Sequence, residues 1–200
     1  MGKAVLTSIQ PKWVEKIASG EKTIEVRKSA PKCDVPFKGY IYCTKAKTIG
    51  DIILCKSEEN AKLFGYNAVK GINKGFAEKE DIDLKGKVIG EFVCDNIDEF
   101  FVFPDGAIQY WNYANLEKSC LTYEEIANYI GKDKKGYAWH ISDLKIYNKP
   151  KELSEFYTKK KCDACEVSGY ESTACVYDED CKVPIAITRA PQSWQYVEEL

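Results

Sequence analysis

The hydrophobic period of the chain changes at Gly20, and this change constrains the fold more than any other feature of the sequence. Residues 11–18 carry apolar side chains at helical spacing and begin with a proline, which suits a first helical turn. Gly20 stands where a helix commonly ends. Beyond it, apolar and polar residues alternate, which is typical of a strand. The sequence therefore predicts a short helix followed directly by a strand.

This predicted strand carries a dense group of charges. Ile24 and Val26 fall on its apolar face. Glu25 and Arg27 fall on the opposite face, and Lys22 stands at the turn before the strand. The simplest interpretation is an outward face with an exposed Glu25–Arg27 ion pair, worth at most about 1 kcal/mol. The alternative is a functional site built on an ordered strand.

The same residues carry a resemblance to a known family. The turn and strand reproduce, without a gap, the pattern G-x-K-x-x-E-x-R at Gly20, Lys22, Glu25 and Arg27. This pattern resembles that of the ASCH family, whose members adopt the PUA-like fold of small, partly open β-barrels. The resemblance is specific over residues 3–45 and continues, with insertions, over 84–147. It does not extend to the cysteine-rich stretch near the C-terminus.

The rest of the pattern predicts a mainly β protein. Thr122 and Glu125 have the spacing of a capping box at the start of a second helix, which Gly131 ends. The β-rich runs lie at residues 4–8, 39–44, 52–55, 86–94 (continuing loosely to 103), 137–142 and 144–147. We therefore expect an α+β fold with flanking helices, a PUA-like, partly open and mostly antiparallel β-barrel.

The expected domain organisation is one main domain with additions. Residues 1–150 form the ASCH/PUA-like domain, interrupted around 56–83 by an insertion in which no hydrophobic period is sustained. Residues 151–200 form a cysteine-containing C-terminal extension that packs on the barrel or trails from it.

Composition limits the classes of function. The chain is 44% apolar and 30% charged. Its net charge of −2 gives it no overall positive potential of the kind that attracts nucleic acid non-specifically. An anionic ligand would have to meet a local basic patch. No run approaches the ~18 apolar residues of a membrane span, and no secretory segment is visible. We expect a cytoplasmic protein whose nine cysteines are thiols or metal ligands rather than disulfides.

Four cysteines near the C-terminus form a candidate metal site. They follow the spacing C-x2-C-x9-C-x5-C at Cys162, Cys165, Cys175 and Cys181. Four thiolates so spaced can close a tetrahedral site, so we expect one structural Zn²⁺. An iron–sulfur cluster or a set of reduced surface thiols is the alternative. Three others lie in predicted strands and are most simply small core residues: Cys43, Cys55 and Cys94.

The family resemblance implies an RNA-binding or nucleotide-ligand-binding module with a regulatory role, such as transcription regulation. Lys22 and Arg27 would meet phosphate or a base edge, and Trp13 or Trp139 would offer a stacking face. Core packing is the simpler interpretation of each tryptophan taken singly. The full set of candidate ligand-binding residues is Trp13, Lys22, Glu25, Arg27, Lys28, Trp139 and His140.

Two other functions stay open. Some small ASCH proteins are amidohydrolases that remove an acyl group from a modified cytidine with a lysine, a threonine and a glutamate. Lys22 matches that lysine, but Glu25 occupies the threonine position and Thr23 lies two residues away. Glu117 lies roughly where those enzymes have their glutamate, so the catalytic candidates are Lys22, Glu25 and Glu117. A protein-interaction module that uses the C-terminal extension is the third possibility.

Overall fold

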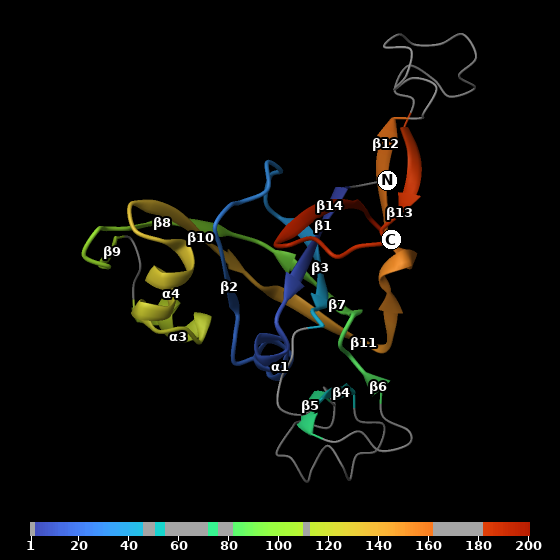
Figure 1. The fold of residues 1–200 in the computed structure, drawn as a ribbon, viewed down its shortest axis with the longest axis horizontal. Helices are drawn as coiled ribbons and strands as arrows, with labels where there is room; N and C mark the ends of the chain where they lie inside the picture. Colours follow the sequence, from blue (N-terminus) through green and yellow to red (C-terminus); the bar gives the residue numbers. More distant parts are fainter. Residues whose placement is uncertain (1–2, 46–50, 55–71, 76–81, 110–112, 162–181) are drawn as a thin grey trace.

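The computed structural model describes residues 3–45, 51–54, 72–75, 82–109, 113–161 and 182–200 (Figure 1). The helices are α1 (Pro11–Ser19), α3 (Tyr113–Ser119), α4 (Tyr123–Ile130) and the 3₁₀ turn η1 (Leu153–Glu155). The strands of the first half are β1 (Lys3–Ile9), β2 (Ile24–Arg27), β3 (Phe37–Cys43), β4 (Asp51–Leu54), β5 (Ile72–Gly75), β6 (Ile82–Asp83) and β7 (Lys87–Cys94). Those of the second half are β8 (Ile97–Val102), β9 (Ile108–Gln109), β10 (Lys134–His140), β11 (Ser142–Glu152), β12 (Tyr157–Lys161), β13 (Lys182–Ala186) and β14 (Trp194–Glu198).

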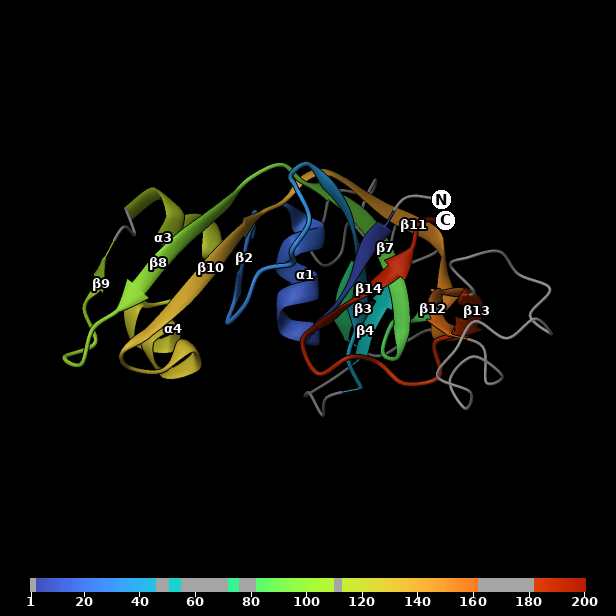
Figure 2. The same ribbon diagram turned by 90° about the horizontal axis from the view of Figure 1, so that it is seen from above.

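Two sheets form the body of the protein. The five-stranded sheet has the order β11-β7-β3-β1-β14, and the four-stranded sheet has the order β2-β10-β8-β9. Every pairing in them is antiparallel except that of β1 with β3. Figure 2 shows the four-stranded sheet reaching away from the first sheet, with α1 between them. The sheets do not close on each other, so the expected mainly β, partly open barrel of the α+β class is confirmed.

The main apolar core joins the five-stranded sheet, α1 and β10. Val14 and Ile17 of α1 pack with Phe92 of β7 and with Trp139 of β10, all of them fully buried. The helix is short, but its apolar residues share one face, and packing of this face stabilises a helix that would be marginal alone. This packing sets the position of β2, which follows α1 directly.

A second core explains the orientation of β2. Ile24 and Val26 pack with Phe100 of β8 and with Ile126 and Ile130 of α4. The apolar face of β2 therefore lies under the helices, and its charged face turns toward the space between β2, β1 and α1. Ile24 and Val26, which the sequence assigns to the apolar face of this strand, thus belong to a helix-covered core separate from the one that contains α1.

The C-terminal residues complete the central sheet. β14 pairs antiparallel with β1, with Thr7 opposite Trp194 and Lys3 opposite Glu198. β1 and β14 accordingly lie side by side in Figure 1. β12 and β13 pair as a separate two-stranded ladder.

Two expectations about the middle of the chain need comment. The long strand expected to run on to residue 103 is wrong, because β7 and β8 belong to different sheets and the chain turns between them. At this turn the Asn96 carbonyl accepts a hydrogen bond from the His140 backbone N–H at 2.9 Å. Of the expected insertion at 56–83, residues 55–71 and 76–81, Cys55 among them, lie outside the described part of the chain. No helix in the described part is long and apolar enough to span a membrane.

Candidate ligand-binding site

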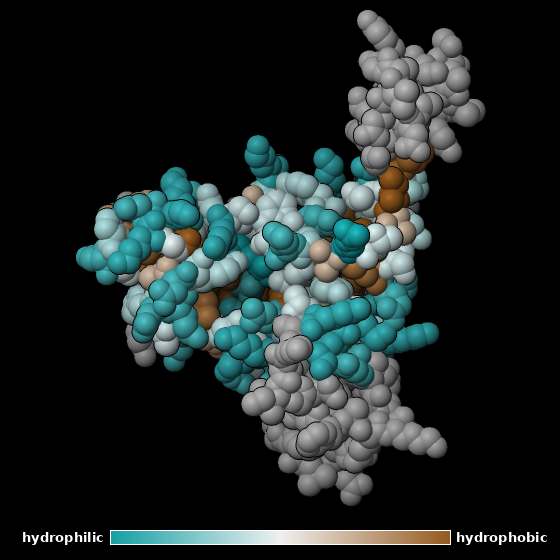
Figure 3. Space-filling model, in the orientation of Figure 1, coloured by the Kyte–Doolittle hydropathy of each residue, from teal (hydrophilic) through white to brown (hydrophobic). Residues whose placement is uncertain are grey.

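A cavity of about 630 Å³ opens beside the charged face of β2. Its walls come from the end of β1, from α1, from α4 and from the segment before β14. In Figure 3 the surface is hollowed where β2 and α4 face β1 and α1, and hydrophilic residues gather around the hollow. Lys22, Glu25 and Arg27 all line this cavity.

These three charged residues form one buried ion-pair group. Glu25 Oε1 lies 3.0 Å from Arg27 Nη2, and Glu25 Oε2 lies 3.4 Å from Lys22 Nζ. The exposed fractions are 2% for Lys22, 7% for Glu25 and 4% for Arg27. The interpretation of this face as an exposed ion pair is therefore wrong.

Lys22 connects three elements of the fold. Its ammonium donates to Ile24 O of β2 and to Ser119 O at the C-terminal end of α3, each at 2.7 Å. It also lies 5.2 Å from the ring centroid of Trp13 on α1. Burial lowers the pKa of Lys22, and the neighbouring Glu25 opposes this by raising it. Two carbonyls and one carboxylate take up the three protons of the ammonium, so none remains for a ligand.

Arg27 forms hydrogen bonds with one residue of β1 and with one residue just before β14. Nη2 donates to Ser8 O at 2.8 Å, and Nη1 lies 3.3 Å from Ser193 Oγ and 3.4 Å from Ser193 O. Burial raises the pKa of the Tyr129 hydroxyl, and the nearby Arg27 guanidinium opposes that shift. The guanidinium is thereby fixed in direction by groups from β1, β2, α4 and the segment before β14.

Three buried polar atoms at the cavity have no hydrogen-bond partner in the described part of the chain. They are Glu25 Oε2, Arg27 Nε and Thr44 Oγ1, and all three residues line the cavity. Buried polar atoms are nearly always hydrogen-bonded, and each exception calls for an explanation. Glu25 Oε2 is held in its ion pair with Lys22 Nζ at 3.4 Å, so one donor, Arg27 Nε, and one hydroxyl, Thr44 Oγ1, are available to a bound molecule.

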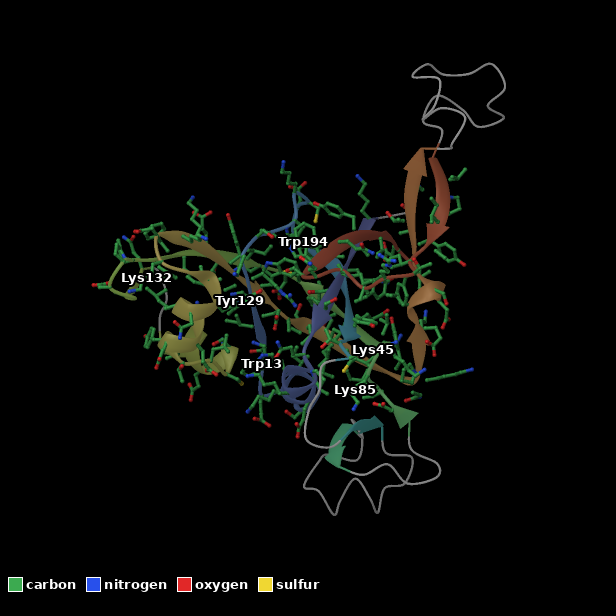
Figure 4. The ribbon with its side chains drawn as sticks, in the orientation of Figure 1. Trp13, Lys45, Lys85, Tyr129, Lys132 and Trp194 are labelled. Carbon is green, nitrogen blue, oxygen red and sulfur yellow. The ribbon has the colours of Figure 1, made fainter. Side chains whose placement is uncertain are left out.

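Aromatic rings with lysines over them stand at the rim. Lys12 Nζ lies 4.2 Å from the Trp13 ring centroid, and Lys28 Nζ lies 5.1 Å from that of Tyr129. Trp13 comes from α1 and Tyr129 from α4, and both line the cavity (Figure 4). Trp13 therefore lines the cavity, whereas Lys28 does not and stands beside it only through its contact with the Tyr129 ring.

Three candidates lie elsewhere. Trp139 is fully buried, with the rings of Phe37 and Trp194 at 5.8 and 5.9 Å, so a base cannot stack on it. Glu117 is an exposed residue of α3 and does not line the cavity. The only histidine, His140, is also absent from the cavity wall.

His140 has an acidic partner that its sequence neighbours do not reveal. Its Nε2 lies 2.8 Å from Asp98 Oδ2, and Asn96 Nδ2 donates to Asp98 Oδ1 at 2.9 Å. Partial burial acts to raise the pKa of Asp98, but these hydrogen bonds hold it below its ordinary value. The cluster lies next to α3, because Asn115 of that helix donates a hydrogen bond to Asp98. In the pairing of β10 with β2, His140 is the partner of Ile24.

Several residues of the site escaped the sequence analysis. Thr44, Tyr129 and Gln192 line the cavity, and Ser193 contacts Arg27. Tyr129 could have been found, because it lies one helical turn after Glu125 on the predicted helix. No local pattern marks the others, since they reach the site only through sheet pairing.

The candidate metal ligands Cys162, Cys165, Cys175 and Cys181 lie outside the described residues. Within the described part, no three His, Cys, Asp or Glu side chains gather as a metal site. Cys43 and Cys94 are fully buried free thiols, and burial raises the pKa of each to about 12, as expected of small core residues.

The fold and the charged cleft define a PUA-like domain. The family model described as the ASCH domain matches residues 8–189, and the chain belongs to this family. The match runs past residue 147, where the sequence resemblance was expected to end, and includes the cysteine-rich stretch.

Solved structures agree on the fold. The chain is similar to ASCH from Zymomonas mobilis, with a TM-score of 0.53 and 16% identity, covering 98% of this chain and 88% of that one. A tyrosine-to-phenylalanine mutant of that protein gives 0.51 and 15%, covering 99% and 92%. A serine-to-alanine mutant gives 0.51 and 15%, covering 98% and 89%. No curated protein sequence matches this chain at a significant level.

Proposed function

We propose that this protein binds RNA or a nucleotide-like ligand in the cavity beside β2 and that it serves as a regulatory module. One observation carries the proposal: a cavity of about 630 Å³ is lined by buried Arg27 and by Thr44, whose Nε and Oγ1 atoms have no partner among the described residues. Ligand pockets of about 300–1,000 Å³ with a few fixed polar groups are typical of small-molecule and cofactor sites. The link of the ASCH family to nucleic-acid binding in general supports this choice of ligand.

The rim has the chemistry that single-stranded nucleic acid requires. Aromatic faces stack unpaired bases, and lysines meet phosphates. Trp13 with Lys12 and Tyr129 with Lys28 offer both on two sides of the cavity. Because the net charge of the protein is −2, we expect these two lysine–aromatic pairs to supply the affinity for RNA, since the protein as a whole does not attract a polyanion.

The test is binding of short single-stranded RNA and of nucleoside monophosphates, measured by fluorescence anisotropy and calorimetry across salt concentrations. Lys12→Ala and Lys28→Ala should each weaken RNA binding and flatten the salt dependence by roughly 0.7 in log–log slope. Tyr129→Ala should weaken binding by about 1–3 kcal/mol through lost stacking. Lys145→Ala is the matched control, because this exposed lysine lies on β11 and does not line the cavity. Absence of binding to all of these ligands would overturn the proposal.

Amidohydrolysis is the second candidate, favoured by one observation. Lys22 is buried beside the cavity with a lowered pKa, as a lysine that activates a nucleophile requires. Thr23, the nearest threonine in the sequence, does not line the cavity, so Thr23→Ala should leave any turnover of an acylated nucleoside unchanged. Turnover that vanishes with Lys22→Met and persists with Thr23→Ala would move the protein to the hydrolases, and loss with Thr23→Ala as well would assign the nucleophile to Thr23.

One structural Zn²⁺ at the four C-terminal cysteines remains a separate proposal. The last pair of the β12–β13 ladder joins Lys161 to Lys182, the residues that flank Cys162 and Cys181 in the sequence. Metal analysis should find close to one zinc per chain, lost with Cys162→Ser and retained with Cys33→Ser. Metal-free protein from a chelator-free preparation would refute this.

A further inference from the structure

The sides of the cavity differ in charge. Six lining residues come from β1, from α1 and from the loops that adjoin β1 and β3, and they include a lysine and no acidic residue: Ser8, Ile9, Gln10, Lys12, Trp13 and Thr44. Another side belongs to α4, whose first turn carries the exposed Glu124 and Glu125, and Glu125 lines the cavity. Lys28, over the Tyr129 ring, offsets part of this negative charge. A polyanion that leaves the cavity is therefore repelled less on the α1 side.

Two further lysines continue the α1 side beyond the cavity. Lys45 follows the cavity residue Thr44, and Lys85 lies in the turn between β6 and β7. Lys45 is exposed and Lys85 is half-buried. Figure 4 shows Lys45 and Lys85 close together in the lower half of the molecule, where Trp13 also lies. Asp83, the last residue of β6, is the acidic residue beside them, and its carboxylate accepts a hydrogen bond from the Lys85 backbone N–H at 3.0 Å. The surface next to Thr44 therefore carries more positive than negative charge.

A glycine next to Lys85 holds Lys45 in place. Gly86 has φ 83°, in the left-handed region, and its N–H donates to Cys43 O at the end of β3 at 2.8 Å. A Cβ atom added at Gly86 would lie 2.5 Å from Lys45 Cε and 3.3 Å from Lys45 Cγ, so the stem of Lys45 packs directly on this glycine. Lysine stems commonly cover the surface in this way while the ammonium stays in water. A stem fixed by packing has less rotamer freedom to lose when its ammonium binds a ligand.

We propose that single-stranded RNA leaves the cavity on the α1 side and that Lys45 and Lys85 bind the phosphates of its flank. Lys12, over the Trp13 ring at the rim, is the first cation on this path. An ammonium binds phosphate as a point charge and contacts no base edge, so this surface adds affinity without adding sequence preference. This assignment rests on the proposed function and selects an oligonucleotide, rather than a single nucleotide, as the full ligand.

The direct test is a length series. Fluorescence anisotropy and calorimetry compare a nucleoside monophosphate with single-stranded RNA of two, four and eight nucleotides of one base composition. Affinity should rise with length, because the longer ligands reach the lysines beyond the rim. The slope of log K against log salt should become steeper by roughly 0.7 for each phosphate that gains a lysine contact.

Variants locate the gain on this surface. Lys45→Ala and Lys85→Ala should each flatten the salt slope for the eight-nucleotide RNA by roughly 0.7, which is about a fivefold loss of affinity at 0.1 M salt. Both should leave the affinity for the nucleoside monophosphate unchanged. Lys45→Arg keeps the charge and should retain most of the affinity, whereas Lys145→Ala, at an exposed lysine of β11, is the matched control and should change neither ligand. Melting curves of each variant show whether the fold is retained.

The outcomes distinguish this inference from the function beneath it. Equal binding of the eight-nucleotide RNA by the wild type and by both alanine variants would overturn the proposed RNA path and leave the proposed function intact. So would an affinity that does not change with RNA length. An equal loss for the nucleoside monophosphate would also overturn the path, because the two lysines would then act on the cavity itself. No binding of RNA or nucleotide would overturn both.

Discussion

Two groups of ion pairs from the same short stretch of sequence differ in almost everything except distance. Lys16 and Glu21 lie 3.0 Å apart, and so do Glu25 and Arg27. The side chains of the first pair are 40% and 60% exposed, whereas those of the second are 9% or less. Separation between charges therefore says little about what a pair contributes, and the surroundings decide it.

The exposed pair is a local arrangement. Lys16 Nζ donates to Glu21, which also accepts from Ser19 Oγ at 3.0 Å. The hydrogen bond to Glu21 raises the pKa of Lys16, and that from Lys16 lowers the pKa of Glu21. Lys16 and Ser19 belong to the last turn of α1 and Glu21 follows its C-cap, and water competes for every contact. The buried group instead connects segments that are distant in the sequence and leaves Arg27 Nε without a partner among the described residues.

The largest expected effect comes from removing the shared negative charge. Glu25→Gln leaves Lys22 and Arg27 buried side by side without a counter-charge, and breaking a buried ion pair in this way costs about 3–5 kcal/mol. Urea unfolding should show this loss. Glu21→Gln, the matched change in the exposed pair, should cost less than about 1 kcal/mol. Similar losses for the two variants would contradict the comparison.

A smaller loss is expected at Lys22. Lys22→Met leaves Ile24 O and Ser119 O without their donor, which should cost about 2 kcal/mol, since Glu25 still retains Arg27. Hydrogen exchange should show α3 opening more easily, because Lys22 holds its last carbonyl. Lys16→Met is the control and should leave exchange in α3 unchanged.

The two lysines should differ in the sign of their pH dependence. The folded-state pKa of Lys22 is lowered, so the unfolded chain binds its proton more tightly and the contribution of Lys22 to stability rises as pH approaches 10.5. The pKa of Lys16 is raised, so its contribution is complete below 10.5 and is lost as pH rises further. The effect at buried Lys22 is at most about 1.4 kcal/mol per pH unit, and that at Lys16 is a small part of this because its side chain is 40% exposed and water screens the pair. Differences in unfolding free energy between the wild type and each Lys→Met variant, measured from pH 8 to 11, isolate them, and a shared sign would be inconsistent with the structure.

The smallest effect is the coupling within the exposed pair. A double-mutant cycle on Lys16 and Glu21 should give about 0.2–1 kcal/mol, and 0.5 M salt should reduce it. The same cycle on Glu25 and Arg27 should give a larger and less salt-dependent coupling. Coupling of equal size and salt sensitivity in both would show that burial does not separate the two pairs.

The features that were predicted correctly from the sequence are those that depend on residues close together in the chain. The helix ends where expected, with Gly20 at φ 82° in the left-handed region that glycine adopts easily. The predicted capping box is present, since Thr122 accepts from the Glu125 backbone and the Glu125 carboxylate accepts from Thr122. Both features depend on residues within one turn of each other.

The burial of the charged residues of β2 could not be predicted, because the residues that cover them are distant in the sequence. Ser119 lies 97 positions from Lys22, and Ser193 lies 166 positions from Arg27. Period-two patterning assigns Glu25 and Arg27 to one face but does not say what covers that face. The break between β7 and β8 is hidden for a similar reason, since both strands are apolar and only their partners differ.

The pairing of β14 with β1 imposes an order on biosynthesis. Thr7 and Ser8 of β1 make their contacts with Ser193 and Pro191, which lie more than 180 positions later in the chain. A nascent chain must hold the free edge of β1 unpaired until these residues are made, and such an edge invites pairing with other chains. Folding of this protein is thus expected to be slow and sensitive to chaperones, because its central sheet gains β14 only after more than 180 further residues have followed β1.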